Sequence, residues 1–340
     1  MAGSKRSLDT DFGAVAHRLM PILILVATSC AAALGVSSAA LSLLAHGGRV
    51  STRLDILTHF APIYLAMALV ALPMCFAATR ELRLGLALCA VAGLVTSGAL
   101  LFPEYLREGR AGSPAEGGQR LKVVQFNAWG GNAAPEAAAA WIFAQDPDVV
   151  VLQEGAAVAA ALSAMGKLHG TCVGCPVTIL TRGKPLSSAS GVPIGRDFSY
   201  LLAVNVESEW GAFTVVGAHC FWPVFRTLSE AQAVDLRKLV ARYPRERMII
   251  AGDFNSTPWS FARRRDDRDF GLIRRTRALF TWPAGKISHN RLPAPFPYLP
   301  IDHVYAGPGW ATVSVERGPR LGSDHYPVVV TLAPRDVAAR

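Results

Sequence analysis

The sequence has few charged residues: Asp, Glu, Lys and Arg make up only 17% of its 340 residues, whereas 51% are hydrophobic and the mean hydropathy is +0.29. This composition excludes a disordered or collagen-like chain and is unusual for a fully soluble protein. Charged residues are completely absent from three stretches, which lie at 19–48, 56–79 and 84–103. The apolar excess is therefore concentrated in the first third of the chain.

Each uncharged stretch is long enough to cross a bilayer, because about 20 helical residues at a rise of 1.5 Å span roughly 30 Å of hydrocarbon. We predict three transmembrane helices, near 19–45, 56–79 and 84–102. A cleaved signal peptide is the alternative for the first, but its apolar run is longer than that of a leader and two further spans follow. His59 lies in the second span, either as a functional group or as an interfacial residue.

The basic residues that flank the spans indicate the orientation. With a cytoplasmic N-terminus, the inner side would carry five of them and the outer side four: Lys5, Arg6, Arg18, Arg80 and Arg83 against Arg49, Arg53, Arg107 and Arg110. The positive-inside rule slightly favours this arrangement. Three spans then place everything after residue 110 on the extracytoplasmic side of the cell membrane.

The segment AGSPAEGGQR, at 111–120, is rich in Gly, Pro and polar residues and predicts a linker. After it the composition becomes that of a globular domain of ordinary size. The predicted order is an N-terminal tail (1–18), a membrane anchor (19–102), a linker (103–120), a globular domain (121–333) and a C-terminal tail (334–340).

The globular domain contains short β-branched runs bounded by turn residues, which predict strands. They lie at 121–126, 148–152, 176–181, 200–206, 212–218, 247–251, 301–305 and 327–332, and helical spacing predicts helices near 134–145 and 227–242. Most of the strands are continuously apolar, so both of their faces should be covered. We therefore expect layered α/β architecture, with sheet packed on sheet and helices outside.

Polar side chains gather at the ends of these strands, while the Gly-rich phosphate loop, the G-x-S-x-G elbow and the H-E-x-x-H motif are all absent. The strand-end residues are Asn127, Glu154, His219, Asp253, Asn255, Asp302, Asp324 and His325. A single Asp or Asn after a strand is more often a turn former or a helix cap than a functional residue. Together they predict a pocket at one edge of a sheet.

Carboxylate and amide oxygens of this set suit Mg²⁺, Mn²⁺ or Ca²⁺ better than zinc. The two histidines lack the Cys/His spacing of a metal site, so they favour acid–base or transition-state roles. Oxygen-bound metal combined with histidine indicates phosphoryl chemistry, in which the metal stabilises charge on phosphate oxygens.

Six motifs in order resemble the endonuclease/exonuclease/phosphatase superfamily, which includes pancreatic deoxyribonuclease, exonuclease III, neutral sphingomyelinases and inositol polyphosphate 5-phosphatases. They are QFNAW (125–129), LQE (152–154), GAH (217–219), AGDFNSTPWS (251–260), IDHVY (301–305) and SDHYPV (323–328). The resemblance covers 121–333 and none of the membrane part. It implies a four-layer α/β sandwich of two packed, mostly antiparallel sheets flanked by helices.

The resemblance also implies a divalent metal, Mg²⁺ with Mn²⁺ as a substitute. Glu154 matches the principal metal ligand of the family. Asn127 matches the amide that helps to hold metal and phosphate, and Asp324 resembles the carboxylate of a second metal site. These implied roles are physically consistent with phosphoryl chemistry. A hydrogen bond to Asp fixes the tautomer of an imidazole, and a metal ion neutralises charge on anionic oxygens.

The remaining matches imply catalytic roles. Asp253 and Asn255 match the pair that orients the attacking water and binds the scissile phosphate. His325 resembles the histidine that contacts phosphate or activates water, with Asp302 orienting it. His219 occupies the position of a histidine general acid for the leaving oxygen in the deoxyribonuclease-like branch.

These residues predict a membrane-anchored, Mg²⁺-dependent phosphodiester hydrolase in which water attacks phosphorus in line. The substrate is either nucleic acid, as for a nuclease, or a lipid headgroup, as for a phospholipid or sphingomyelin phosphodiesterase at the bilayer. A catalytically silent membrane scaffold is the non-enzyme alternative. The sequence indicates no protein partner.

Three further features leave alternatives open. The segment 263–277, with seven Arg and three Asp, predicts either a grip on anionic phosphates or a solvated helix face. Cys172 and Cys175 form a redox motif, a local disulfide or half a zinc site, although no second such pair supports zinc. Trp259 and Trp282 either line the pocket mouth or pack in the core.

Overall fold

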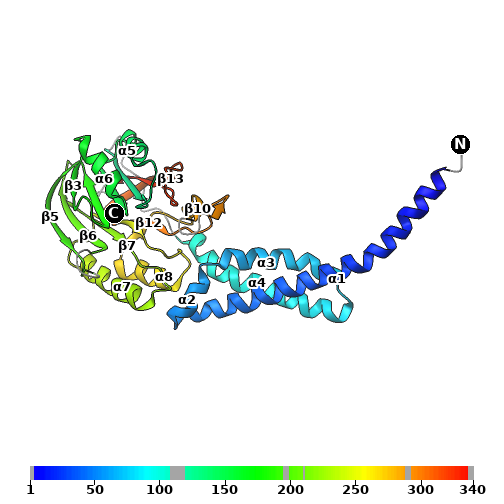
Figure 1. Cartoon of the computed structure of the whole chain (residues 1–340). Coiled ribbons are helices and arrows are strands. Elements are labelled where there is room, and N and C mark those ends of the chain that lie inside the picture. Colours follow the sequence, from blue (N-terminus) through cyan, green and yellow to red (C-terminus); the bar gives the residue numbers. More distant parts are fainter. Residues whose placement is uncertain (1–3, 108–118, 194–198, 210, 288–291, 336–340) are drawn as a thin grey trace. The chain divides into compact units, whose positions relative to one another are not determined.

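A computed structural model describes residues 4–107, 119–193, 199–209, 211–287 and 292–335 (Figure 1). The chain divides into two compact units, Met1–Pro103 and Glu104–Arg340. They are called the N-terminal unit and the C-terminal unit below, and each is described by itself.

The N-terminal unit is helical. Its elements are α1 (Ser4–His46), η1 (Gly47–Arg49), α2 (Thr52–Thr58), α3 (Ala61–Met74), η2 (Cys75–Ala77) and the greater part of α4 (Arg80–Leu106). Two segments, Leu19–Arg49 and Arg80–Leu106, are long and apolar enough to cross a membrane. The predicted second span is α2 with α3 and η2, bent by 54°. The described residues thus contain two helices able to cross a membrane, or three if the bent pair is one span.

Small polar side chains lie between the helices of this unit. Ser38 Oγ donates to Tyr64 O at 2.6 Å, and the hydroxyls of Ser42 and Thr96 are 2.6 Å apart. A Cβ added at Gly93 would collide with Ser38. Close approach of helices through small residues is typical of membrane bundles.

In the part of the C-terminal unit that the structure describes, the strands form two six-stranded sheets and a separate hairpin. The first sheet has the order β13-β14-β1-β2-β4-β3, with β1 (Leu121–Asn127), β2 (Val149–Gln153), β3 (His169–Thr171), β4 (Val177–Thr181), β13 (Trp310–Arg317) and β14 (Val328–Pro334). Among these described strands, β1 and β2 are parallel and the other neighbours are antiparallel.

The second sheet has the order β5-β6-β7-β8-β12-β9. Its strands are β5 (Lys184–Ser190), β6 (Leu201–Glu207), β7 (Phe213–His219), β8 (Met248–Asp253), β9 (Ile273–Arg274) and β12 (Asp302–Ala306). Here the parallel pair is β7 with β8. The hairpin consists of β10 (Gly285–Ile287) and β11 (Leu292–Ala294).

Apolar side chains on both faces of the strands build the layers. In β1, Leu121 and Val123 enter a core shared with the second sheet, while Val124 and Phe126 enter a core with the helices α5 (Pro135–Ala144) and α6 (Ala156–Ala164). The helix α7 (Arg226–Ala241) and Phe270 of α8 (Phe261–Phe270) pack on the outer face of the second sheet. The predicted α/β architecture of two sheets flanked by helices is confirmed (Figure 1).

Candidate active site

The strand registers bring the predicted polar residues to one edge of the sheets. Asn127 lies opposite Gln153, the residue before Glu154, in the parallel pair β1–β2. In the second sheet Asp253 lies opposite His219 on one side and Asp302 on the other. Because the carboxyl ends of parallel strands meet at the same edge, residues from distant parts of the sequence become neighbours here.

Asp253 is at the centre of this group and is 1% exposed. Its Oδ2 accepts a hydrogen bond from Asn127 Nδ2 at 3.0 Å, and its Oδ1 accepts one from the backbone N–H of Asn255 at 2.9 Å. His219 Nε2 lies 3.9 Å from Asp253 Oδ2 and 3.5 Å from Glu154 Oε1. The cluster thus contains two carboxylates, two amides and an imidazole.

A second imidazole approaches the same oxygen of Asp253. His325 Nδ1 hydrogen-bonds to Asp302 Oδ2 at 2.8 Å, and its Nε2 lies 3.6 Å from Asp253 Oδ2. Asp253, Asp302 and His325 each offer one atom that could bind a metal ion, and these three atoms all lie within 4.8 Å of one another. All three side chains are buried.

Two of the residues that follow strands have left-handed backbone conformations. Glu154 has φ 51° and Asn255 has φ 46°, which is uncommon for non-glycine residues. Glu154 is held by its N–H, which donates to Pro176 O at 3.0 Å, and the Asn255 amide donates to Cys220 O at 2.8 Å. Unusual backbone geometry at these two positions is typical of functional sites.

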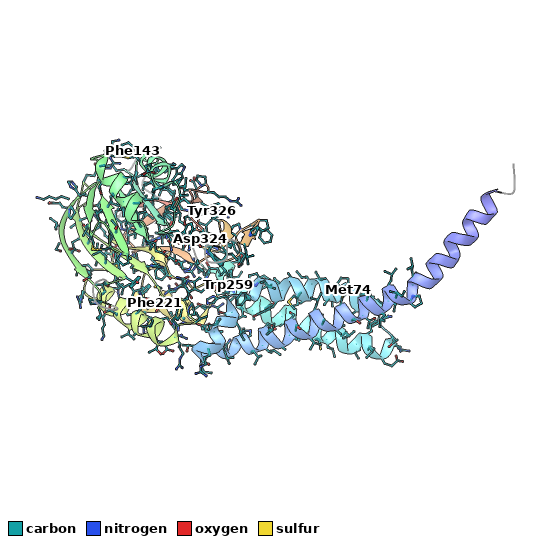
Figure 2. All side chains as sticks on the ribbon, viewed as in Figure 1. Met74, Phe143, Phe221, Trp259, Asp324 and Tyr326 are labelled. Atoms are coloured by element: carbon teal, nitrogen blue, oxygen red, sulfur yellow. A yellow bond between two sulfur atoms is a disulfide. The ribbon has the colours of Figure 1, made fainter. Side chains whose placement is uncertain are left out.

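Asp324 and Tyr326, the neighbours of His325, are labelled in Figure 2. Asp324 Oδ2 accepts a hydrogen bond from Trp282 Nε1 at 3.1 Å. The loop is tied to β1 because Ser323 Oγ donates to Asn127 O at 2.7 Å and accepts from the His325 N–H at 3.0 Å. All eight predicted site residues therefore lie at one edge of the C-terminal unit.

The model of the Endonuclease/Exonuclease/phosphatase family matches residues 124–325 of the chain, more than half of its length. The chain belongs to the endonuclease/exonuclease/phosphatase family. The match begins within β1 and ends at His325, so it contains the whole site.

Solved structures agree with this family fold. The chain is similar to an endonuclease/exonuclease/phosphatase from Beutenbergia cavernae, with 25% identity and a TM-score of 0.50, over 65% of this chain and 74% of that one. A family protein from Bacteroides vulgatus shares the fold at 16% identity and a TM-score of 0.50, over 64% of this chain and 100% of that one. None of the curated proteins compared with the chain matches it.

Burial and neighbouring charges shift the pKa values of three residues in the site of this endonuclease/exonuclease/phosphatase family member. Burial raises the pKa of Asp253 to about 7, although His325 opposes the shift. Burial by itself would lower the pKa of His325, but Asp302 and Asp253 outweigh it and raise that pKa to about 10. Burial lowers the pKa of His219, with Glu154 acting in the opposite direction.

The donors present fit a hard divalent cation. The carboxylates of Asp253 and Glu154 share the amide of Asn127, whose Nδ2 is 3.3 Å from Glu154 Oε1. Burial disfavours the charged form of Asp253, and an added cation would favour it. The tight cluster Asp253–Asp302–His325 differs from the predicted ligands Asn127, Glu154 and Asp324, so that ligand assignment stays a prediction.

Three of the seven arginines in the segment 263–277 are buried, which neither of the two hypotheses from the sequence predicts. Arg263, Arg274 and Arg275 are 2–3% exposed. Arg263 lies over the ring of Phe254 at 4.2 Å, and Arg275 donates to the carbonyl oxygens of Ala306, Gly307 and Trp310. Buried arginines with protein partners are not available to bind phosphates.

The remaining alternatives are also decided by contacts. Cys172 and Cys175 form a disulfide. Trp259 is fully buried and packs near Phe280, so it belongs to the core. Trp282 is 7% exposed and lies beside the site, where its indole N–H is the donor to Asp324.

Sequence reasoning assigned no role to Gln125 and Gln153. Both lie on the inward rows of their strands, β1 and β2, among apolar side chains, and both are fully buried. A polar residue at an inward position of an otherwise apolar strand is the signal that could have identified them.

Proposed function

We propose that the protein is a membrane-anchored, divalent-metal-dependent phosphodiester hydrolase. The proposal rests on one observation in a chain that belongs to this family. Asp253, Glu154, Asn127 and two histidines, whose pKa values are shifted in opposite directions, lie together at one edge of the two sheets. Paired carboxylates, amide donors and imidazoles are the groups that phosphoryl transfer to water requires.

The chain's own residues supply positioning and proton transfer. Asp253 and Asn255, joined by the backbone hydrogen bond of 2.9 Å, orient the attacking water and can take its proton. As the new P–O bond forms and the bond to the leaving oxygen breaks, His219 donates a proton to that oxygen. Burial lowers the pKa of His219 and disfavours its imidazolium, whereas the Glu154 carboxylate, whose Oε1 lies 3.5 Å from His219 Nε2, favours the protonated form that donates. His325, cationic beside Asp302, stabilises charge on the phosphate oxygens.

Asn127, Glu154 and Asp324 are the residues that we assign to the metal. Bound there, Mg²⁺ would neutralise charge on the phosphate and polarise its oxygens. Ser323 Oγ donates to Asn127 O, which ties the loop of Asp324 to the end of β1.

A lipid phosphodiester is the substrate that the surface near the site favours. Immediately after His219, the side chains of Trp222, Val224 and Phe225 are 47–58% exposed. Trp222 also contacts Trp282, the partner of Asp324, with ring centroids 6.2 Å apart. Exposed aromatic and apolar side chains are typical of surfaces that meet a lipid interface. The burial of three arginines in segment 263–277 weakens the nuclease alternative.

Hydrolysis by the full chain in detergent tests the proposal. With Mg²⁺ we expect release of headgroup from phospholipid or sphingomyelin vesicles, and EDTA should lower the rate at least about 100-fold because metal stabilisation amounts to several kcal/mol. Added Mg²⁺ or Mn²⁺ should restore it. Glu154→Gln should be equally inactive, whereas Glu207→Gln, an exposed carboxylate at the opposite end of β6, should keep wild-type activity.

The other outcomes are distinct. Cleavage of plasmid DNA without headgroup release would support the nuclease alternative. Activity that resists both EDTA and Glu154→Gln would refute the metal site. Absence of hydrolysis of every phosphoester, together with tight binding of a protein, would support the scaffold.

We further propose three membrane spans and an extracytoplasmic C-terminal unit. The disulfide between Cys172 and Cys175 supports this side, because disulfides persist in oxidising compartments and are rare in the cytoplasm. The flanking basic residues, five inside against four outside, agree with it.

Reporters fused after residue 340 test this orientation in a bacterial host. A periplasm-dependent alkaline phosphatase should be active at this position, and a fluorescent protein that matures only in the cytoplasm should stay dark. The reverse result would show a cytoplasmic C-terminal unit, as two spans with a cytoplasmic N-terminus would produce.

A further inference from the structure

Gln125 is a buried amide in an apolar row. It points, with Leu121 and Val123, toward the core between the two sheets and has no exposed surface. Burial of an amide is costly unless hydrogen bonds compensate the lost hydration. The bonds that Gln125 makes therefore explain its presence in this row.

Both hydrogens of Gln125 Nε2 have acceptors. One is donated to Asp302 Oδ1 at 2.8 Å and the other to Gln153 Oε1 at 2.8 Å. The second carboxylate oxygen of Asp302, Oδ2, bonds to His325 Nδ1, also at 2.8 Å. Asp302 is thus held from one side by Gln125 while it orients His325 on the other. A hydrogen bond to an ionised carboxylate is about twice as strong as one between neutral groups.

The two glutamines are oriented at a cost. Gln125 Oε1 and Gln153 Nε2 are buried and have no hydrogen-bond partner among the described residues. Rotating the Gln125 amide would place its oxygen against the Asp302 carboxylate, and rotating Gln153 would place two N–H₂ groups face to face. The observed orientation of the two amides leaves Gln125 Oε1 and Gln153 Nε2 without hydrogen bonds in the described part of the chain and points the Gln125 N–H₂ group at Asp302. The cost of two unsatisfied atoms indicates that the hydrogen bond from Gln125 to Asp302 has a role.

We propose that Gln125 is a positioning residue for the Asp302–His325 pair, with Gln153 fixing the rotation of its amide. The inference rests on the proposed function, since it assigns Gln125 to the same site. Gln125 acts through Asp302. Its hydrogen bond to Oδ1 holds the carboxylate in the orientation in which Oδ2 hydrogen-bonds to His325 Nδ1.

The test is Gln125→Met in the full chain in detergent, because methionine keeps the length and volume of the side chain and removes its hydrogen bonds. With Mg²⁺ and the phosphodiester substrate, kcat should fall about 10- to 100-fold, as for other outer-sphere partners. KM should change less than about twofold, because uniform substrate binding is retained. Leu121→Met, a volume-conserving change in the same row, should leave both constants at wild-type values.

A second measurement does not depend on activity. The proton between His325 Nδ1 and Asp302 Oδ2 should give a downfield resonance, assigned by its loss in His325→Gln. In Gln125→Met this resonance should move or broaden, and in Leu121→Met it should not. If no phosphodiester is cleaved by the wild type, this signal still decides the positioning role while the proposed function fails.

Gln153→Met provides a milder variant should Gln125→Met not fold. It keeps the donor that faces Asp302 and frees its rotation, so we expect a smaller loss of kcat and partial broadening of the same resonance. A folded Gln125→Met with wild-type kcat and an unchanged resonance would overturn the inference. If only the milder variant folds, wild-type kcat and an unchanged resonance in Gln153→Met would also overturn it.

Discussion

Replacing Asp253 by Asn is expected to lower kcat/KM for phosphodiester hydrolysis by a factor of about 1,000, within the range of general-base catalysis. The variant removes the negative charge that His325 and His219 face at 3.6 and 3.9 Å. It also turns an N–H₂ group toward the amide donor of Asn127 or the N–H of Asn255, so the water-orienting pair is lost. Steady-state kinetics of the full chain with Mg²⁺, with Glu207→Gln as control, measures the change.

The same variant should have the opposite effect on stability in EDTA. Because burial raises the folded-state pKa of Asp253 from 3.8 to about 7, ionisation of this group opposes folding, and the wild type loses stability as pH rises through that window. Relative to wild type, Asp253→Asn should therefore gain free energy of unfolding between pH 4 and pH 8, by at least the 1.4 kcal/mol or so that one pKa unit represents. Unfolding curves at the two pH values measure it. If the difference in free energy of unfolding between Asp253→Asn and wild type were the same at pH 4 and pH 8, or if the variant kept activity near wild type, Asp253 would not be the central group of the site.

The continuously apolar strands could be predicted well because their hydrophobic runs are a strong signal. Each of the eight predicted strands lies within two residues of an observed one, since apolar β-branched runs covered on both faces have few alternative structures. Six of the described strands were not predicted: β3, β5, β9, β10, β11 and β13. β5 was missed because its sequence, KPLSSAS, is polar and mostly exposed. α6 was missed because its sequence, AAVAAALSA, has no polar face that would reveal a helical period.

The site residues could be predicted as a set, but their contacts could not. Turn residues after strands are ambiguous one by one, and the order of the six motifs selected the functional ones. The role of the Gln125 amide could not be predicted, because its partner Asp302 lies 177 residues later in the sequence and meets it only in the folded protein. The burial of Arg274 and Arg275 could not be predicted for the same reason, because their partners lie far away in the sequence, at Glu104 and at the carbonyl oxygens of Ala306 and Gly307.

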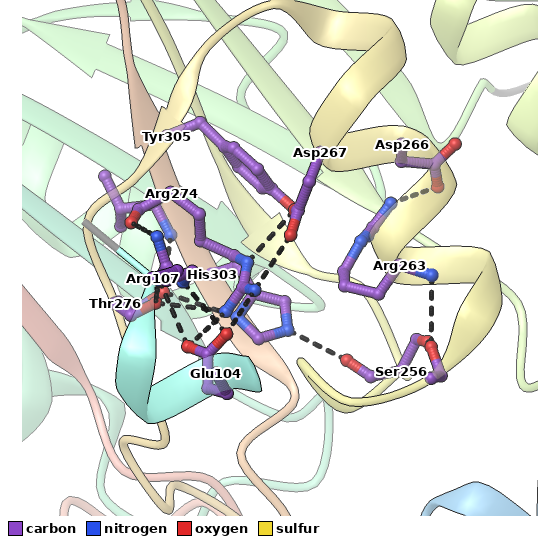
Figure 3. A network of polar contacts seen from close by, with 12 residues as sticks. Glu104, Arg107, Ser256, Arg263, Asp266, Asp267, Arg274, Thr276, His303 and Tyr305 are labelled. Carbon is purple, nitrogen blue, oxygen red and sulfur yellow. Dashed lines mark hydrogen bonds and ion pairs between the residues drawn. The ribbon is translucent and has the colours of Figure 1, made fainter. Parts of the chain in front are cut away.

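One of these arginines lies in a buried ionic network, shown in Figure 3. The Arg274 side chain is 1% exposed and bonds two carboxylates, each by two contacts: Glu104 at 2.8 and 3.0 Å, and Asp267 at 2.9 and 3.1 Å. Arg107 also binds Glu104 and donates to the backbone oxygens of Arg274 and Thr276. Burial would raise the pKa of Asp267, but the hydrogen bonds and charge of Arg274 lower it to about 2. The end of α4 is thus built into the C-terminal unit.

Replacing Arg274 by Met should lower the free energy of unfolding of this unit by about 3–5 kcal/mol, because it leaves the buried carboxylate of Glu104 and the partly exposed carboxylate of Asp267 short of countercharge. Urea unfolding of the full chain in detergent, followed by tryptophan fluorescence, measures this, since all seven tryptophans lie after residue 104. Arg182→Met is the matched control: Arg182 also binds two carboxylates but is 37% exposed, so its loss should cost about 1 kcal/mol or less. Equal effects of the two substitutions would mean that the buried ionic network stabilises the C-terminal unit no more than the exposed ion pairs of Arg182 do. A large effect of Arg274→Met alone would instead require any catalytic fragment to begin at or before Glu104.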